Sequence, residues 1–211
     1  QFRKINNESV SRKTNDIGTL FRSNTKKNNS FSLDNLNGII NFDVENKWIE
    51  VGGKTRFYDI LNFTLKHNLI PMVVPELSSI TVGGAISGIS IESSSFRYGW
   101  GHDTVTEVDV LTASGEVLCC TPDNENKDLF NSMPNSYGTL GYITRAKINL
   151  VDSKKYVKLN NHKFDNSKDA FAFIKIAVSN KDVNFIDSVA YSKYNIVVVL
   201  GVLCDNLDYI N

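Results

Sequence analysis

The chain has 211 residues, of which 41% are hydrophobic and 22% charged, a balance typical of a globular protein with one or two domains. Its 23 basic and 23 acidic side chains cancel, so no overall electric field attracts nucleic acid or an anionic membrane surface. No apolar run reaches the roughly 18 residues that a membrane-spanning helix needs.

The three cysteines, Cys119, Cys120 and Cys204, are odd in number and lack the spacing of metal ligands. They predict free thiols in a reducing compartment and no metal site. We therefore expect a cytoplasmic protein, or one peripheral to a membrane and facing the cytosol. The chain opens on Gln1 and stops just after an expected strand. We expect a piece of a longer protein, in which membrane association could come only from segments not present; the oligomeric state is left open.

The first expected elements alternate strand and helix. Short β-prone runs at 39–43 and 48–51 predict two strands. A helix is expected from 57 to 69, with Thr55 as its N-cap and Pro71 ending it. Its apolar positions recur at helical spacing and are Phe57, Ile60, Leu61, Leu65 and Leu69.

The segment from Thr81 to Ser95 carries the most information. Its side chains are mostly small and include a single charge, Glu92. The glycines permit a close approach to a ligand, and bare backbone N–H groups could form a nest for an anion. Interleaved isoleucines argue against a flexible Gly/Ser linker. The pattern favours a cradle for a phosphate-bearing cofactor, with a linker and a tightly turned core segment without ligand as the open alternatives.

The next part of the chain is rich in expected strands. Runs at 105–113 and 116–121, separated by Ser114 and Gly115, predict a hairpin with a two-residue turn. A short helix is expected at 127–133. From 142 to 151 the sequence alternates, which predicts a half-buried antiparallel strand. One face would carry Tyr142, Thr144, Ala146, Ile148 and Leu150.

The last part, from Tyr156 onward, is expected to begin a second domain after a charged connector at 152–155. A helix at about 167–178 should bury Phe171, Ile174 and Val178. The strand expected at 196–203 is apolar on both faces and needs cover on both sides. We therefore expect exposed apolar surface near 197–199 and a tendency to associate.

Several motifs occur along the chain in a characteristic order. The chain carries Pro75-Glu76-Leu77, then Thr81-Val82-Gly83-Gly84, and then Gly88-x-x-Ile91-Glu92-Ser93-Ser94-Ser95. Later stretches are Cys120-Thr121-Pro122, Asp128-Leu129-Phe130, Gly138 to Gly141 and Lys154 to Leu159. In this order they resemble the FAD-binding domain of vanillyl-alcohol-oxidase-type (PCMH-type) flavoproteins. Within that superfamily they are most similar to the Δ24-sterol reductase group and its bacterial FAD-linked relatives.

This resemblance implies an α+β fold with a two-subdomain FAD-binding domain at 1–155, divided at about residue 70. The start of a C-terminal cap domain at 156–211 would follow. It also implies a noncovalently bound FAD between the subdomains. The residues carried over to the cofactor are Thr81, Val82, Gly83, Gly84, Ala85, Ile86, Ser87, Gly88, Ile91, Glu92, Ser93, Ser94, Gly138, Gly141 and Ile143. Thr14 and Asn15 would stand in the N-terminal phosphate loop of the family.

Two individual roles stay open in the sequence. For His102 there are three alternatives, namely a structural residue, a covalent tether for FAD, and a catalytic base. Glu92 and Arg97 pair with each other or face the cofactor phosphates.

Two functions also stay open. The first is an FAD-dependent oxidoreductase that transfers a hydride between flavin and a small organic substrate, by reduction of a sterol-like or isoprenoid-like alkene or by oxidation of an alcohol. The alternative is a catalytically silent flavin-fold module that serves binding or assembly.

Overall fold

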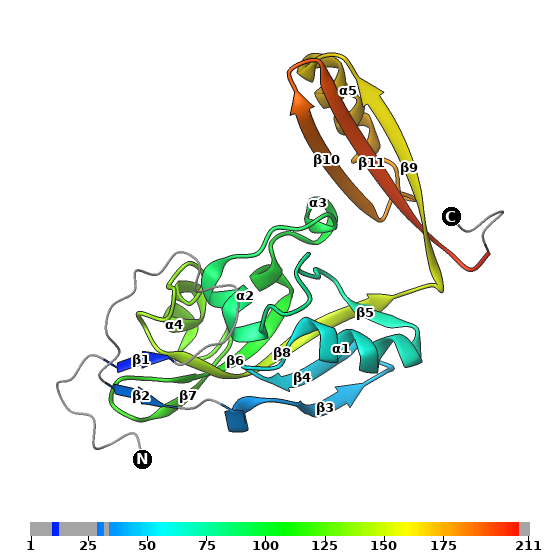
Figure 1. The fold of residues 1–211 in the computed structure, drawn as a ribbon. Helices are drawn as coiled ribbons and strands as arrows, with labels where there is room; N and C mark the ends of the chain where they lie inside the picture. Colours follow the sequence, from blue (N-terminus) through cyan, green and yellow to red (C-terminus); the bar gives the residue numbers. More distant parts are fainter. Residues whose placement is uncertain (1–9, 13–28, 32–33, 207–211) are drawn as a thin grey trace.

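The computed structural model describes residues 10–12, 29–31 and 34–206, and two antiparallel sheets organise most of it (Figure 1). The first sheet has the order β3-β4-β8-β6-β7, and β5 pairs with β8 beside that path. Its strands are β3 (Ile39–Asp43), β4 (Trp48–Gly52), β5 (Leu69–Pro71), β6 (Val105–Leu111), β7 (Val117–Cys120) and β8 (Tyr142–Asp152). The expected α+β class is therefore present. A short parallel pair, β1 (Val10–Arg12) and β2 (Asn29–Phe31), lies outside this sheet.

The main core lies between one face of the first sheet and the helices α1 (Phe57–Thr64), α2 (Val82–Gly88) and α4 (Lys127–Ser132). A row of small and branched side chains crosses four strands at the same register, Val51, Ala146, Val108 and Cys120. Each of the four is at most 1% exposed. Burial of this row holds the helices against the sheet, because apolar area removed from water is the main stabilising term.

The opposite face of the same sheet is polar and centres on Arg145. Its guanidinium donates to both carboxylate oxygens of Asp109, at 2.8 and 2.9 Å, and to Glu50 at 3.1 Å. It also pairs with Glu107. The hydrogen bonds to Asp109 are the main cause of the raised pKa of Arg145. Three carboxylates on two strands thus share one cation across the sheet.

Strand β8 departs from the alternation expected from the sequence. Asp109 is paired with Arg145, but the next residue, Val110, is paired with Ile143, so Thr144 is an extra residue in a β-bulge. The bulge reverses the side-chain parity at the beginning of the strand. Ile143 is therefore the buried residue, and the expectation that Tyr142 and Thr144 share the buried face was wrong. The expected inward positions of Ala146, Ile148 and Leu150 are confirmed.

The helix expected at 57–69 is shorter than its apolar spacing predicts. α1 ends at Thr64, a 3-10 turn covers Leu65–His67, and Asn68 adopts a left-handed conformation with φ 55°. Leu69 to Pro71 then pairs with β8 as β5. Thr55 is not the N-cap either, because Arg56 holds that position. The Thr55 side chain instead accepts a hydrogen bond from the backbone N–H of Gly38 at 2.8 Å.

The hairpin of β6 and β7 has a longer turn than expected. Thr112 and Glu116 pair through a backbone hydrogen bond of 2.9 Å, so Ala113, Ser114 and Gly115 form a three-residue connection. Gly115 has φ 85°, which is the usual geometry for the last position of such a turn. The hairpin itself and helix α4 are where the sequence predicts them.

The second sheet has the order β10-β11-β9 and stands beyond the end of β8, which continues into β9 (Figure 1). Its elements are β9 (Tyr156–Phe164), α5 (Ser167–Ala177), β10 (Phe185–Ser192) and β11 (Asn195–Cys204). We call these residues the C-terminal unit. Strands β9 and β10 were not expected from the sequence. Helix α5 covers one face of the sheet around Val198, which is fully buried.

Helix α5 presents a different face to its sheet than the sequence suggests. Phe171 and Val178 are exposed by 70% and 43%, whereas Ala170 and Ala177 are buried. The prediction that Phe171 and Val178 are core residues was therefore wrong. The other face of the sheet is open and includes Val157, Leu159 and Val189, which are exposed by 41%, 62% and 44%. The assignment of this unit to a separate domain stays a prediction, as does a subdomain boundary near residue 70, although β4 and β8 lie in one sheet.

Candidate functional site

The first part of the Gly/Ser segment is a helix. Thr81 precedes α2 in an extended conformation, and its hydroxyl accepts a long hydrogen bond of 3.3 Å from the backbone N–H of Gly84. The hydroxyl is therefore an ordinary N-cap. The inward side chains are Val82, Ala85 and Ile86, each at most 6% exposed. These buried positions exclude a flexible linker for this stretch.

Backbone hydrogen bonds fix the beginning of α2 on the turn that follows β4. The N–H of Val82 donates to Thr55 O at 2.9 Å, and the N–H of Gly83 donates to Gly53 O at 2.8 Å. The nest of bare N–H groups expected here is therefore largely absent, because these donors already have backbone partners. What the glycines provide instead is close approach. A Cβ on Gly83 would lie 3.0 Å from Gly53 O and 3.5 Å from the Ile143 side chain.

A small cavity of about 40 Å³ opens where the turn after β4, the start of α2 and the start of β8 meet. Its lining residues are Leu36, Gly53, Lys54, Thr81, Gly83, Gly84, Ser87, Gly141, Tyr142 and Ile143. Gly141, with φ 155°, has to be glycine, since a Cβ there would lie 2.7 Å from Leu111 O. The wall thus combines exposed backbone, the three hydroxyl-bearing side chains of Thr81, Ser87 and Tyr142, and one ammonium group. This set of groups suits a ligand that bears phosphate.

The comparison with known families agrees with this chemistry. Residues 17–121 match the family model described as an FAD binding domain, and this range contains the turn after β4 and the whole of α2. The chain contains an FAD-binding domain. Its cofactor is FAD, as the resemblance in the sequence implied.

Curated relatives carry the match further along the chain. The chain is 32% identical over 189 residues to the Delta(24)-sterol reductase of Macaca fascicularis, which covers 87% of this chain and 35% of the reductase. It is 39% identical over 127 residues to that of Pisum sativum, covering 60% of this chain and 22% of the relative. Cytokinin dehydrogenase 10 of Oryza sativa subsp. japonica is 38% identical over 119 residues, covering 56% and 22%. The chain spans about a third of the length of the first of these relatives.

The residues of the FAD-binding domain fit part of the cofactor. The cavity brings together six of the predicted cofactor residues, Thr81, Gly83, Gly84, Ser87, Gly141 and Ile143. A volume of about 40 Å³ accepts a group of the size of a phosphate, not the whole dinucleotide. Val82, Ala85 and Ile86 face the core instead. Thr14 and Asn15, predicted for the phosphate loop, lie outside the described residues.

The sequence reading missed four wall residues, Leu36, Gly53, Lys54 and Tyr142, and Gly53 and Lys54 are the most informative of them. The Gly52-Gly53 pair could have indicated the site, because one glycine is enough for a turn at the end of a strand and a second one suggests close backbone contact. A Cβ on Gly53 would overlap the carbonyl of Ile143. Lys54 follows directly and brings the positive charge. Its position depends on a turn and a bulge that meet only in the folded sheet.

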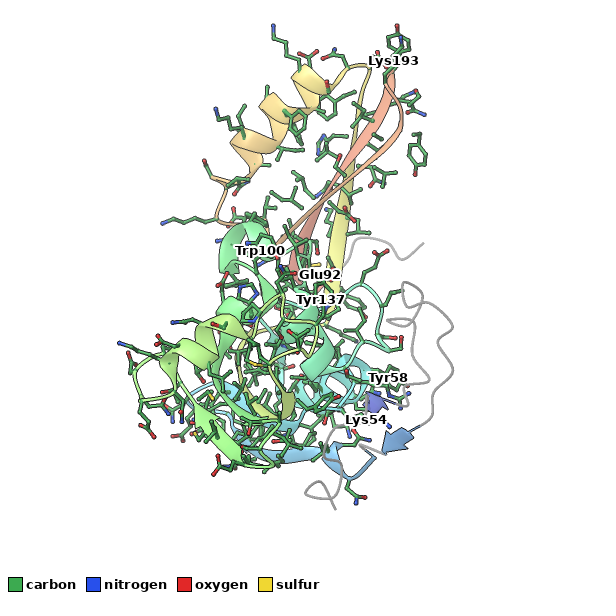
Figure 2. All side chains as sticks on the ribbon, turned by 90° about the vertical axis from the view of Figure 1, so that its left-hand side faces the viewer. Lys54, Tyr58, Glu92, Trp100, Tyr137 and Lys193 are labelled. Carbon is green, nitrogen blue, oxygen red and sulfur yellow. The ribbon has the colours of Figure 1, made fainter. Side chains whose placement is uncertain are left out.

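The second part of the predicted cofactor stretch lies elsewhere. Ile91, Glu92 and Ser93 line a cavity of about 340 Å³ shared with Ile174, Val178 and Ile186 of the C-terminal unit. The N–H of Ile186 donates to Ser93 O at 2.8 Å. We call this space the junction cavity, and Figure 2 shows Glu92 and Trp100 at the end of the C-terminal unit nearest the first sheet. The structure therefore divides the segment from Thr81 to Ser94 between two sites.

Hydrogen bonds fix the loops near the point where the segment from Thr81 to Ser94 passes from one cavity to the other. The Ser94 hydroxyl donates to Met72 O at 2.8 Å. The N–H of Tyr137 donates to Ser87 O at 3.0 Å, which holds the loop of Gly138 against the end of α2. Gly88 has open space around the position of a Cβ. Gly88 and Gly138 thus flank the described cavity without lining it.

Glu92 and Arg97 do not pair with each other. Glu92 Oε2 accepts from the backbone N–H of Glu76 at 3.1 Å. Burial raises the pKa of Glu92, and the carboxylates of Glu76 and Asp187 raise it further. Arg97 instead donates through Nη2 to three backbone carbonyls of the C-terminal unit, those of Asn180, Lys181 and Val183. The pairing of Glu92 with Arg97, one of the two alternatives that the sequence left open, was wrong.

His102 lies in a different place from the FAD cavity. It belongs to the 3-10 turn η5 (Gly101–Thr104), and its Nε2 is 3.6 Å from Asp103 Oδ1. Its Nδ1 is buried and has no hydrogen-bond partner within the described part of the chain. The imidazole lines a cavity on another face of α2, with α4 on the far side. His102 therefore does not line the described FAD cavity, and its role as a structural residue stays a prediction.

The polar face of the first sheet brings one thiol close to two carboxylates. One ligand atom each of Glu107, Asp109 and Cys119 lies within 4.8 Å of the others. Partial burial raises the pKa of the Cys119 thiol, and the two carboxylates raise it further. Arg145 already neutralises part of this charge, so the cluster is explained as a structural ion-pair network. None of the helices in the described ranges combines the length and the hydropathy of a membrane-spanning segment.

Proposed function

We propose that this chain is the cofactor-binding part of an FAD-dependent oxidoreductase. The observation that carries the proposal is the cavity between Gly53, the start of α2 and Gly141, which lies in the stretch that matches an FAD binding domain. Bound FAD would supply the hydride chemistry. Because the described cavity holds only a phosphate-sized group, Thr81, Ser87 and Lys54 would bind the pyrophosphate of the cofactor there.

The binding is proposed to be noncovalent. Among the described residues, the lining of the FAD cavity contains neither His nor Cys. His102 lines another cavity, and the Cys120 side chain is fully buried in the core. In this proposal the groups of the cavity hold the phosphates of FAD by hydrogen bonds, charge and shape. Gly84 is the exposed position of α2 where an added side chain would enter the space of the cofactor.

The junction cavity is proposed to receive the organic substrate. Its walls are mainly apolar and include Ile91 and Phe96 from the FAD-binding domain and Ile174 and Ile186 from the C-terminal unit. A volume of about 340 Å³ lies in the range of small-molecule sites. Glu92 is the acidic group in its lining, and its raised pKa suits a group that holds a proton beside an apolar ligand. The C-terminal unit would then act as the beginning of a cap domain.

This arrangement favours a hydrophobic substrate of the alkene or alcohol class. Relatives named as a sterol reductase and as a cytokinin dehydrogenase support an oxidoreductase but differ in the direction of their reactions. A sterol-like or isoprenoid-like alkene fits the apolar walls better than a strongly polar substrate does. Reduction of such an alkene is therefore the favoured reaction in this proposal. Glu92 would contribute by placing a proton beside the reacting carbon atoms.

The test begins with the visible absorbance of the purified chain. We expect a yellow protein whose colour is released into the supernatant by acid precipitation, because the cofactor is held noncovalently. Colour that stays in the pellet would contradict the noncovalent binding. Reduction of the bound flavin by a reduced nicotinamide cofactor, or by a candidate alcohol that is oxidised in turn, under anaerobic conditions supports the oxidoreductase. A yellow protein that no donor reduces would support the silent flavin-fold module instead.

A further inference from the structure

A cavity outside both proposed sites lies between η5, α2 and α4. Its volume is about 340 Å³, enough for on the order of ten water molecules at roughly 30 Å³ each. Ile86 of α2, Val108 of β6 and Met133 after α4 form its floor, and all three are at most 4% exposed. The residues that line the FAD cavity from α2 are Gly83, Gly84 and Ser87, so the same short helix separates two spaces.

The rim of this cavity is polar and carries a negative charge. Asp103 Oδ2 accepts from the backbone N–H of Trp100 at 2.7 Å, and its side chain remains 49% exposed. Its Oδ1 is 3.6 Å from His102 Nε2, which is too long for a hydrogen bond. Within the described ranges, Asp103 has no ion pair with lysine or arginine. The rim therefore offers a carboxylate acceptor above an apolar floor.

The mouth of the cavity is open at α4, where Asn131 is an exposed lining residue. Phe130, on the same helix, is half-buried against the core and also lines the space. Aromatic and branched walls favour a flat apolar group, and a nearby carboxylate favours a cation or a strong hydrogen-bond donor. These two preferences are met together by a small molecule with one ring and one amine.

We propose that this cavity is an accessory binding site for a small aryl-alkyl amine. The ring lies on Ile86, Val108 and Met133, and the protonated amine pairs with the carboxylate of Asp103. The site shares no lining residue with the FAD cavity or the junction cavity, and we expect it to bind its ligand while FAD is bound. It requires no turnover and stands independently of the proposed oxidoreductase.

The test uses the full chain saturated with FAD, with methyl-labelled isoleucine, valine and methionine, and benzylamine as the probe. We expect saturable NMR shifts confined to Ile86, Val105, Val108 and Met133, at roughly millimolar affinity for a ligand of this size. Asn131→Trp should fill the mouth and weaken binding by about tenfold or more, and Asn131→Ala should bind as the unaltered chain does. Asp103→Asn should weaken benzylamine by about fivefold and leave benzyl alcohol unchanged.

Three results would overturn the proposal. The first is a set of shifts at the FAD cavity or the junction cavity instead of the floor residues. The second is equal affinity of Asn131→Trp and Asn131→Ala for the probe. The third is an equal loss of benzylamine and benzyl alcohol in Asp103→Asn. If Asn131→Trp does not fold, as judged by its methyl spectrum, the comparison of the two probes in Asp103→Asn decides the question.

Discussion

Arg97 Nη2 donates a hydrogen bond of 2.6 Å to the carbonyl oxygen of Val183, across the boundary between the FAD-binding domain and the C-terminal unit. The same nitrogen also reaches the carbonyls of Asn180 and Lys181, at 3.2 and 3.3 Å. These three carbonyls follow α5, and β10 begins two residues after Val183. One guanidinium therefore holds the turn that carries Ile186 to the junction cavity.

Removal of this contact should loosen the junction. We expect Arg97→Met to speed hydrogen exchange at the amides of 184–188, with a loss of stability of about 1–2 kcal/mol because the hydrogen bonds are charge-assisted and partly solvated. Hydrogen-exchange mass spectrometry measures this. Lys193→Met, at the far end of the C-terminal strands in Figure 2, is the matched control and should leave exchange at 184–188 unchanged. Equal protection in both variants would contradict the role of Arg97.

Substitution at two glycines should separate cofactor binding from folding. Gly84→Val should fold and lose FAD, because a Cβ there meets only the Thr81 hydroxyl at 3.0 Å and the rest of the side chain enters the cavity. Gly53→Ala should fail to fold, because its Cβ would overlap the Ile143 carbonyl. Flavin content and far-UV circular dichroism distinguish the two results. Full flavin content in folded Gly84→Val would remove α2 from the FAD site.

The ion-pair network on the polar sheet face should contribute measurably to stability. Arg145→Met leaves Glu50, Glu107 and Asp109 close together without their shared cation, and we expect a loss of about 2 kcal/mol because all four side chains are only 18–28% exposed. Lys147→Met is the control on the same strand and face, where the ammonium lies 3.8 Å from the centre of the Trp48 ring. Urea unfolding of both variants measures the difference. A loss no larger than that of Lys147→Met would show that the network is energetically neutral.

Glu92 should make stability depend on pH. Because burial raises its pKa in the folded state, the folded chain holds this proton more tightly than the unfolded chain does. Its ionised form therefore costs stability above the folded pKa, and this cost disappears below the usual glutamate pKa of about 4.3. Glu92→Gln should raise the melting temperature by up to about 2 °C at pH 7 and by nothing near pH 4. A constant difference across this range would exclude the ionisation as its cause.

The boundary near residue 155 can be tested by shortening the chain. The open face of the C-terminal sheet includes Val157, Leu159 and Val189. We expect the chain that ends at Val151 to be monomeric and to keep the flavin affinity of the first domain, while the full chain associates as concentration rises. Gel filtration and flavin titration compare the two. An aggregating short chain beside a monomeric long one would place 156–211 in the cofactor domain.

Local sequence patterns predicted those elements whose causes are local. The alternation of Ala146, Ile148 and Leu150 predicted the buried face of β8, and the two strands before α1 follow their β-prone runs. The order of the Gly/Ser motifs indicated the FAD-binding domain through its resemblance to a known family. Close backbone approach requires small residues at particular positions. Alternating apolar residues and small residues at particular positions can be read directly from the sequence.

The tertiary structure decided what depends on partners distant in the chain. The bulge at Thr144 arises from the register shift between the pairs Asp109–Arg145 and Val110–Ile143, and it moves Ile143 to the core against the alternation of its own strand. Backbone hydrogen bonds from Gly53 N–H to Thr144 O and from Gly83 N–H to Gly53 O place the turn after β4 beside α2. Arg97 is a nearby partner for Glu92 in sequence but hydrogen-bonds the C-terminal unit. The sequence indicated an α+β fold and, through its resemblance to a family, an FAD-binding domain, whereas the division of Thr81 to Ser94 between two cavities follows from packing between segments that no local pattern contains.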